Sequence, residues 1–257
     1  MKPQGNPMHE ATARIQQQTR SRFWVGLALD DVEVAEAQQL RYHVFADEMG
    51  ARLPSAHLGL DIDAFDAFCD HLIVRDRESR DVVGTYRILS PSQAKKAGGY
   101  YSEQEFDLVR FHQLRPRMAE LGRSCVHPDY RSGAVIALLW NGLADYMIHH
   151  GYDHIIGCAS VTMADGGYVA AKVYEKLIEK FLSPIDWRAR PRNRLPLESL
   201  TTSVDALPPP LIKAYVRLGA WVCGEPSWDP DFNTADLLMM LPMERLNTAY
   251  ARRLLPV

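Results

Sequence analysis

A glutamate and an arginine stand three residues apart at the start of an apolar segment, Glu120-Leu-Gly-Arg123-Ser-Cys-Val. Charged side chains are costly to bury in an apolar strand unless they are paired, so this pattern indicates a functional role. A buried carboxylate can act as a general base that removes a proton from an amine. Residues three apart in a strand point to opposite faces, so a bulge is needed to bring Glu120 and Arg123 to one site.

A second group of candidate residues lies upstream. Arg41 and Phe45 are four residues apart in a predicted helix and therefore share one of its faces. Asp63 and Asp66 belong to a short acidic segment, and Arg87 falls in a predicted strand that follows it. Clustered carboxylates can bind a cation, and an arginine can bind a carboxylate through two N–H groups. The alternative interpretation is an ion-pair network in which Asp63 and Asp66 brace Arg41.

A phosphate site is predicted where a turn leads into the strongest helical pattern of the chain. Arg131-Ser132-Gly133 precedes the segment VIALLWNGLADYMIHH, whose apolar residues recur at helical spacing. Free N–H groups at the start of a helix bind phosphate, and a glycine there allows close approach. We therefore expect Arg131, Ser132 and Gly133 to contact the phosphate of a pantetheine arm or of coenzyme A.

The elements that must position these residues alternate between strand and helix. Strands are expected at residues 23–29, 71–76, 82–89, 118–126, 153–161 and 234–243. Helices are expected at residues 31–49, 135–150, 168–181 and 244–255, and a short helix followed by a strand within 208–226. The strands at 71–76 and 82–89 are predicted to form an antiparallel pair, because a short polar turn separates them. This order predicts an α/β (α+β) fold, with a mixed central sheet flanked by helices.

Composition excludes several classes of function. The chain of 257 residues is 47% hydrophobic and 24% charged, with a formal net charge of −3. This balance gives no overall attraction to nucleic acid, so no nucleic-acid partner is expected. The four cysteines lie far apart, and no metal site or disulfide framework is expected. Residues 1–20 are predicted to be a flexible polar tail, residues 21–257 one domain, and the location cytoplasmic, because no long apolar run is present.

From Arg41 to Arg131, the order of these motifs resembles the acyl-homoserine-lactone synthase branch of the GNAT superfamily. That branch has an R-x-x-x-F helix, a D-x-x-D pair, an arginine in the following strand and E-x-S-R in the fourth strand. Downstream, WRARPRNRLP and PPPLIKAYVRLGAWVCGEPSWDPDFNTADLLMML resemble the ornithine N-acyltransferases. The resemblance implies a GNAT-like, mostly antiparallel central sheet with a C-terminal elaboration.

The same resemblance implies transfer of a (3-hydroxy)fatty acyl group from an acyl carrier protein thioester to the α-amine of L-ornithine, giving lyso-ornithine lipid. Glu120 is the implied base, acting directly or through a water, and Arg123 positions the acyl carbonyl. Arg87 binds the amino-acid carboxylate or holds Glu120, and Asp63 and Asp66 hold the side-chain ammonium. The acyl-phosphopantetheine of the carrier protein is the donor substrate, and no other cofactor is implied.

Four arginines alternate along a proline-rich loop: Arg188, Arg190, Arg192 and Arg194. One interpretation is a solvated loop. The other is contact with an anionic surface, either the acidic acyl carrier protein or lipid headgroups at the inner face of the cytoplasmic membrane.

Two other functions stay open on the sequence alone. The first is an N-acyltransferase with a different acceptor: glycine, another amino acid, or S-adenosylmethionine, which would give an acyl-homoserine lactone. The second is a non-catalytic protein that binds acyl carrier protein or membrane on the same scaffold. The presence of both Glu120 and Arg123 argues against the second.

Overall fold

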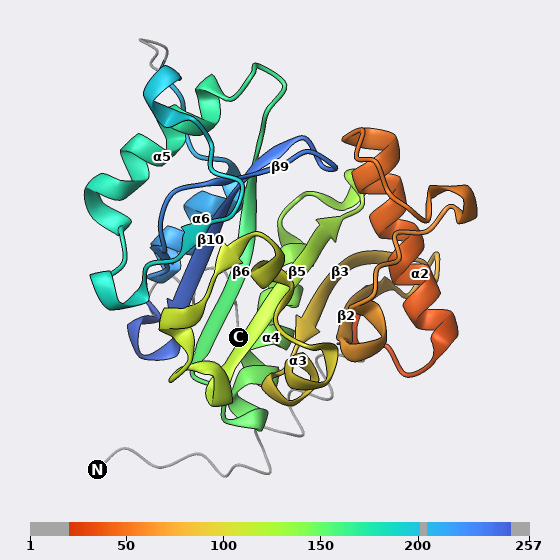
Figure 1. The fold of residues 1–257 in the computed structure, drawn as a ribbon. Helices are drawn as coiled ribbons and strands as arrows, with labels where there is room; N and C mark the ends of the chain where they lie inside the picture. Colours follow the sequence, from red (N-terminus) through yellow and green to blue (C-terminus); the bar gives the residue numbers. More distant parts are fainter. Residues whose placement is uncertain (1–20, 201–204, 248–257) are drawn as a thin grey trace, which may run out of the picture.

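A mixed, mostly antiparallel sheet forms the centre of the computed structural model, which describes residues 21–200 and 205–247 (Figure 1). Its strands are β1 (Phe23–Leu27), β2 (Asp70–Asp76), β3 (Val82–Leu89), β5 (Met118–Val126), β6 (His154–Thr162), β8 (Trp221–Val222), β9 (Ser227–Asp229) and β10 (Thr234–Pro242). Their spatial order is β1-β2-β3-β5-β6-β10-β8, and β9 also pairs with β10. β5 and β6 run parallel, whereas the pairs around them are antiparallel. The expected sheet, including the β2–β3 pair, is confirmed.

Helices cover both faces of this sheet. They are α2 (Asp31–Tyr42), α3 (Pro91–Ala97), α4 (Ala134–His150), α5 (Tyr168–Phe181) and α6 (Pro210–Leu218). α2 begins after Asp30, whose side chain accepts hydrogen bonds from two N–H groups of the first turn. α2 continues as a π-helix, His43–Glu48, where a regular helix was expected. α4 ends as expected at Gly151, which has a φ of 67°. A two-stranded sheet of β4 (Phe106–Asp107) and β7 (Arg190–Pro191) completes the fold.

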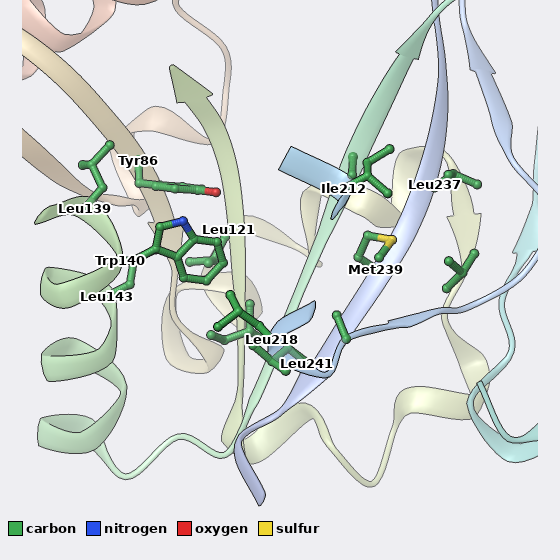
Figure 2. Packing of buried hydrophobic residues seen from close by; sticks show 14 of the residues in the cluster. Tyr86, Leu121, Leu139, Trp140, Leu143, Ile212, Leu218, Leu237, Met239 and Leu241 are labelled. Carbon is green, nitrogen blue, oxygen red and sulfur yellow. The ribbon is translucent and has the colours of Figure 1, made fainter. Parts of the chain in front are cut away.

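The alternation of side chains along the strands builds apolar layers on the two faces of the sheet. On β2, Leu72 and Val74 pack in the layer that contains the α4 residues, whereas Ile73 packs with the α2 residues on the opposite face. In the α4 layer, Trp140 lies edge-on to Tyr86 of β3, with ring centroids 6.3 Å apart (Figure 2). Burial of such large apolar side chains, worth about 1.5–3 kcal/mol each, fixes the strands against the helices.

The parallel pair β5–β6 is short. Met118, Ala119 and Glu120 pair with residues 154–156, and the pairing then stops. The two backbones approach closely at Gly157, where an added Cβ would lie 2.4 Å from the carbonyl oxygen of Leu121. Beyond that point β5 continues along β3 and β6 along β10, so the two central strands separate.

β5 also carries the bulge expected between Glu120 and Arg123. The β3–β5 register shifts between Thr85 and Arg87. Opposite this shift, Arg123 has a φ of 52°, in the left-handed region that non-glycine residues rarely adopt. As a result Glu120 and Arg123 both contact Tyr101, and the predicted bulge is confirmed.

The C-terminal helix expected at residues 244–255 is not found where the structure describes the chain. Met243–Arg245 forms a single 3-10 turn, and residues 246–247 are not helical. The N–H group of Asn247 instead donates to the carbonyl oxygen of Leu218, so the chain packs against the end of α6. Residues 248–257, like the predicted tail 1–20, lie outside the described residues. Within the described ranges, none of the helices combines the length and hydrophobicity that crossing a membrane requires.

Candidate active site

A cavity of about 340 Å³ lies where β5 and β6 separate. β5 supplies residues 120–126 to its wall, and β6 supplies Cys158 and Ser160. Tyr86, from the apolar layer that includes α4, and Phe45, from the layer that includes α2, both line it. The cavity therefore reaches both faces of the sheet.

Arg41 is fully buried and anchors an ion-pair network beside this cavity. Its Nε donates to Asp61 Oδ2 at 2.8 Å, and its Nη1 donates to Asp66 Oδ1 at 2.8 Å. Burial raises the pKa of Asp66, but the hydrogen bond and charge of Arg41 outweigh it and lower that pKa to about 2. Asp66 is therefore held as a carboxylate beside the guanidinium group of Arg41, which Asp61 also contacts.

Arg87 and Arg123 extend the network toward the cavity. Arg87 Nη1 lies 2.6 Å from Asp63 Oδ1, and Arg123 donates to Asp61 Oδ2 and Asp63 Oδ2 at 3.1 Å each. The ring of Tyr101 lies under both guanidinium groups, 5.4 Å and 5.0 Å from their central carbons. Asp66 thus contacts Arg41 as in the alternative interpretation, in which Asp63 and Asp66 brace Arg41, whereas Asp63 contacts Arg87 and Arg123 instead.

Glu120 lines the cavity and is almost fully buried. Its carboxylate accepts hydrogen bonds from the N–H groups of Tyr101 at 2.5 Å and Ser102 at 2.8 Å. Burial raises the pKa of Glu120, and these hydrogen bonds offset only part of the effect. Two roles were considered for Arg87: binding the amino-acid carboxylate or holding Glu120. The ion pair of Arg87 is with Asp63 rather than with Glu120. A carboxylate with a raised pKa at a cavity wall has the properties of a general base.

Phe45 and a second phenylalanine close the cavity on the α2 side. Phe45, in the π-helix that follows α2, packs edge-on against Phe232 with ring centroids 5.8 Å apart. Phe232 also covers the guanidinium of Arg123, whose central carbon lies 4.7 Å from the ring centroid. The wall is thus apolar, with one cation held over aromatic faces.

The predicted phosphate residues lie at the edge of the cavity. Arg131 lines it and pairs with both carboxylate oxygens of Glu48, at 2.6 and 2.7 Å. Gly133, with a φ of 102°, precedes α4, and no described side chain caps the first N–H groups of that helix. Ser132 is exposed and, like Gly133, is outside the cavity lining. The helix start therefore offers free N–H groups, while Arg131 is already paired.

The arginine-rich loop lies away from the cavity wall, and three of its four arginines are tied to nearby groups. Arg188 donates to the carbonyl oxygen of Ser183 at 3.2 Å, and Arg192 donates to that of Glu103 at 2.8 Å. Arg194 forms ion pairs with Glu198 and Glu225. Arg190 is exposed and belongs to the short strand β7.

A second cluster of polar side chains beside this cavity was not predicted from the sequence: Glu105, Cys158 and Asp236. One ligand atom of each lies within 4.8 Å of the others, which makes them the described side chains best placed to hold a cation. Asp236 stands alone among the apolar residues of β10, and that isolation was the available signal. Glu105 gave no signal, because it follows an irregular polar segment and meets Asp236 only through the fold.

The electrostatics of this cluster differ from those of the arginine network. Burial, followed by the charge of Asp236, raises the pKa of Glu105 to about 9. Burial also raises the pKa of Asp236 to about 6, although Thr234 donates a hydrogen bond to it. The thiol of Cys125, which also lines the cavity, has a pKa raised to about 12 by burial, so it is poorly suited to form an acyl-enzyme intermediate.

Comparison with known proteins agrees with this architecture. The acetyltransferase (GNAT) domain profile matches residues 40–141. The solved structure of FeeM, an N-acyl amino acid synthase from uncultured soil microbes, is 11% identical and superposes with a TM-score of 0.56 over 89% of this chain and 97% of that one. The coenzyme A-dependent acyl-homoserine lactone synthase BjaI is 14% identical, with a TM-score of 0.50 over 88% and 85%. These two similarities show the fold alone.

Closer relatives cover nearly the whole chain. The L-ornithine N(alpha)-acyltransferase of Brucella abortus (strain 2308) is 39% identical over 245 residues, which are 88% of this chain and 86% of that protein. The L-ornithine N(alpha)-acyltransferase of Rhodobacter capsulatus is 37% identical over 242 residues, 88% of this chain and 92% of that protein. Together with the GNAT sheet and the cavity between β5 and β6, this similarity shows that the chain belongs to the L-ornithine N(alpha)-acyltransferase family of GNAT enzymes.

Proposed function

We propose that this chain transfers a (3-hydroxy)fatty acyl group from the thioester of an acyl carrier protein to the α-amine of L-ornithine, giving lyso-ornithine lipid. The observation that carries the proposal is the placement of Glu120, Arg87 and Arg123 around one cavity, in a chain whose relatives are named for ornithine acylation. This reaction would be the first step in the synthesis of ornithine lipid, in the cytoplasm.

The donor thioester would lie between the separated strands. Residues of β5 beyond Glu120 have lost their β6 partners, so their backbone groups on that side can hydrogen-bond to a pantetheine arm and to the developing oxyanion. The free N–H groups at the start of α4, with Ser132 and Gly133, would meet the phosphate of the arm. Arg131 would contribute if its pair with Glu48 opens. Carrier-protein pantetheine is preferred here to free coenzyme A because of the family resemblance. In addition, Arg131-Ser-Gly133-Ala134 lacks the second glycine of the generic GNAT phosphate motif, which argues against free coenzyme A.

The acyl chain would extend toward the α4 face of the sheet. Leu121 and Tyr215 line the main cavity and also a small apolar gap of about 20 Å³ beside Trp140. Leu121 and Trp140 belong to the buried layer shown in Figure 2, and Tyr215 packs against that layer. An alkyl chain that enters this layer gains apolar burial without meeting unpaired charges.

The reaction is a direct attack. Glu120, acting directly or through a water, would take a proton from the α-ammonium group, and the free amine would attack the thioester carbonyl carbon. The C–N bond forms and the C–S bond breaks, so the products are an amide, a pantetheine thiol and one released proton. Arg123 would position the acyl carbonyl, and Arg87 would bind the amino-acid carboxylate. Phe45 would shape the wall beside them, while Asp61, Asp63, Asp66 and Arg41 hold the two arginines in place.

The proposal is tested with purified protein, a 3-hydroxyacyl carrier protein and a pool of amino acids, with products read by mass spectrometry. We expect N-acylornithine as the main product. Acylation of another amine would change the acceptor, and absence of any product with retained carrier binding would favour a non-catalytic protein. Acyl-coenzyme A as a parallel donor decides between the two thioesters.

Glu120→Gln tests the base. The amide keeps the shape of the side chain but cannot accept a proton, so we expect kcat to fall by about 10²–10⁴-fold. Carrier-protein binding should be unchanged, and Glu179→Gln, at an exposed position of α5, serves as the control. Wild-type kcat in Glu120→Gln would remove Glu120 from the mechanism.

The arginine-rich loop is proposed to meet an anionic surface, either the carrier protein or anionic lipid at the inner membrane face. Binding to anionic vesicles that is absent, or that does not weaken with salt, would remove the lipid alternative.

A further inference from the structure

We propose that Asp236 and Glu105 form the subsite for the side-chain ammonium group of a diamino acid acceptor. This inference rests on the proposed function and deepens it, because it says which residues distinguish ornithine from amino acids with uncharged side chains. It also replaces the expectation that Asp63 and Asp66 hold this ammonium group.

The position of the subsite follows from the cavity wall. Asp236 of β10 and Cys158 of β6 both line the cavity, with Asp229 and Ser160 close by. The carboxyl group of Glu105 lies within 4.8 Å of the ligand atoms of Asp236 and Cys158. An ammonium group that enters the cavity would contact Asp236 directly, and Glu105 would add a second negative charge next to it.

An unsatisfied buried group provides independent support. Each carboxylate oxygen of Glu105 exposes less than 1 Å² and has no hydrogen-bond partner among the described residues. Buried carboxyl groups in folded proteins normally have partners, so a carboxyl group left in this state indicates a missing donor. The described part of the chain also places no lysine or arginine nitrogen within ion-pair distance of Glu105 or Asp236, in contrast to Asp61, Asp63 and Asp66.

The charges in the cavity match the charges of a diamino acid. Arg123 faces the aspartate network on one side, and its charge also acts on Glu105 and Asp236. With Arg87 as the cation for the α-carboxylate and Glu120 as the base for the α-amine, the cavity also offers a distal ammonium group Asp236, with Glu105 beside it. An ammonium group has three donors and no acceptor, which suits two carboxyl groups better than one.

Proton release is expected to accompany binding. The charges that act on Glu105 are those of Asp236, Asp229, Glu120 and Arg123, and the Cys158 thiol lies beside it. Burial together with the acidic neighbours keeps the pKa of Glu105 high. An incoming positive charge favours the ionised form of both carboxyl groups, so the acceptor would displace the proton held there. A metal ion is the less suitable occupant, because burial raises the pKa of the Cys158 thiol and disfavours the thiolate that a metal requires.

The experiment compares L-ornithine with L-norvaline, which has the same carbon skeleton without the side-chain amine. For the wild type we expect kcat/KM for ornithine to exceed that for norvaline by at least about 100-fold, as for a site built around a buried charged contact. In Asp236→Asn and in Glu105→Gln, that ratio should fall more than about tenfold, mainly through a higher KM for ornithine. Glu175→Gln, an exposed position of α5, is the matched control and should keep the wild-type ratio.

Binding of ornithine without acyl donor, measured by calorimetry in a buffer with chelator, separates this inference from the proposed function. Ornithine binding that both variants weaken supports the subsite even if no acyl transfer is found. Acylation of ornithine with an unchanged ornithine-to-norvaline ratio in both variants overturns the subsite and leaves the function. A wild type that neither binds nor acylates ornithine overturns both, and ornithine selectivity that disappears with the chelator would assign the cluster to a metal. Thermal unfolding confirms that each variant is folded.

Discussion

At the scale of single residues, Arg41 is a buried cation that holds the carboxylates of Asp61 and Asp66 in place. Its guanidinium contacts Asp61 and Asp66 with no exposure to solvent. Removing one partner of a buried ion pair leaves an uncompensated charge, which is far more costly than the loss of an exposed pair.

We therefore expect Arg41→Met to lower the free energy of unfolding by about 3–5 kcal/mol. Arg41→Lys should also destabilise the protein, because an ammonium group cannot reproduce the planar, branched contacts. The control is Arg75→Met, whose partly exposed pairs with Glu33 and Glu36 should cost only about 1 kcal/mol or less. Urea denaturation measures all three, and equal losses for Arg41→Met and Arg75→Met would contradict the buried network.

Glu105 is a buried acid whose contribution to the free energy of unfolding depends on pH. Its pKa lies near 9 in the folded protein, against an ordinary value of 4.5, so the folded state keeps a proton that the unfolded state releases. Stability from this group is fully present below about pH 4.5 and is lost as the pH rises toward about 9. Glu105→Gln removes the titration, so its free energy of unfolding should fall less between pH 5 and pH 8 than that of the wild type. Parallel stability profiles for the two proteins would show that Glu105 is ionised in the folded state.

At the scale of elements, the 3-10 helix Tyr101–Gln104 links the two charged groups of the site. Its first N–H groups hold Glu120, and the ring of Tyr101 lies under Arg87 and Arg123. Glu105 follows directly at its end. One short turn therefore brings Glu120, the two arginines and Glu105 close together.

The close approach of β5 and β6, just before the two strands separate, depends on Gly157. An alanine Cβ there would lie 2.4 Å from the carbonyl oxygen of Leu121, and a backbone atom cannot move aside as a flexible side chain can. Gly157→Ala should force the strands apart, lower the free energy of unfolding by about 1–3 kcal/mol and raise KM for the acyl donor. Gly122→Ala is the control for stability, since an added Cβ there meets nothing within 4 Å. Equal unfolding midpoints for the two variants would show that the close approach is not essential.

At the scale of the whole molecule, features set by local sequence pattern could be predicted, whereas features set by contacts between distant segments could not. Short apolar runs were enough to predict the strands, and apolar residues at helical spacing were enough to predict α4. The spacing of Glu120 and Arg123 was enough to require a bulge. The meeting of Glu105 with Asp236 could not be predicted, because it depends on how a loop packs on a strand far along the chain. The π-helix after α2 was missed for a similar reason, since its residues have an ordinary helical pattern and its backbone register is set by packing.

Charge at the whole-molecule scale bears on the donor. The net charge of −3 does not favour an acidic carrier protein, so docking needs a local basic surface. The arginine-rich loop does not line the cavity, but it pairs with β9, whose Asp229 does. Arg192 and Arg194 are exposed but are held by Glu103 and by Glu198 and Glu225. Arg190 is also exposed, and the described residues show no side-chain contact for it.

Arg190→Glu should therefore raise KM for acyl carrier protein about threefold to tenfold, the effect of about 1 kcal/mol at an exposed charge contact. The kcat/KM for a small acyl-pantetheine donor should not change, because that donor reaches the cavity without the carrier surface. The difference in KM for acyl carrier protein between Arg190→Glu and the wild type should shrink as salt screens the attraction between Arg190 and the carrier. Lys96→Glu, at an exposed position of α3, removes the same charge elsewhere and should leave both donors unaffected. An equal loss with both donors would mean that Arg190 supports the fold of the loop rather than carrier docking.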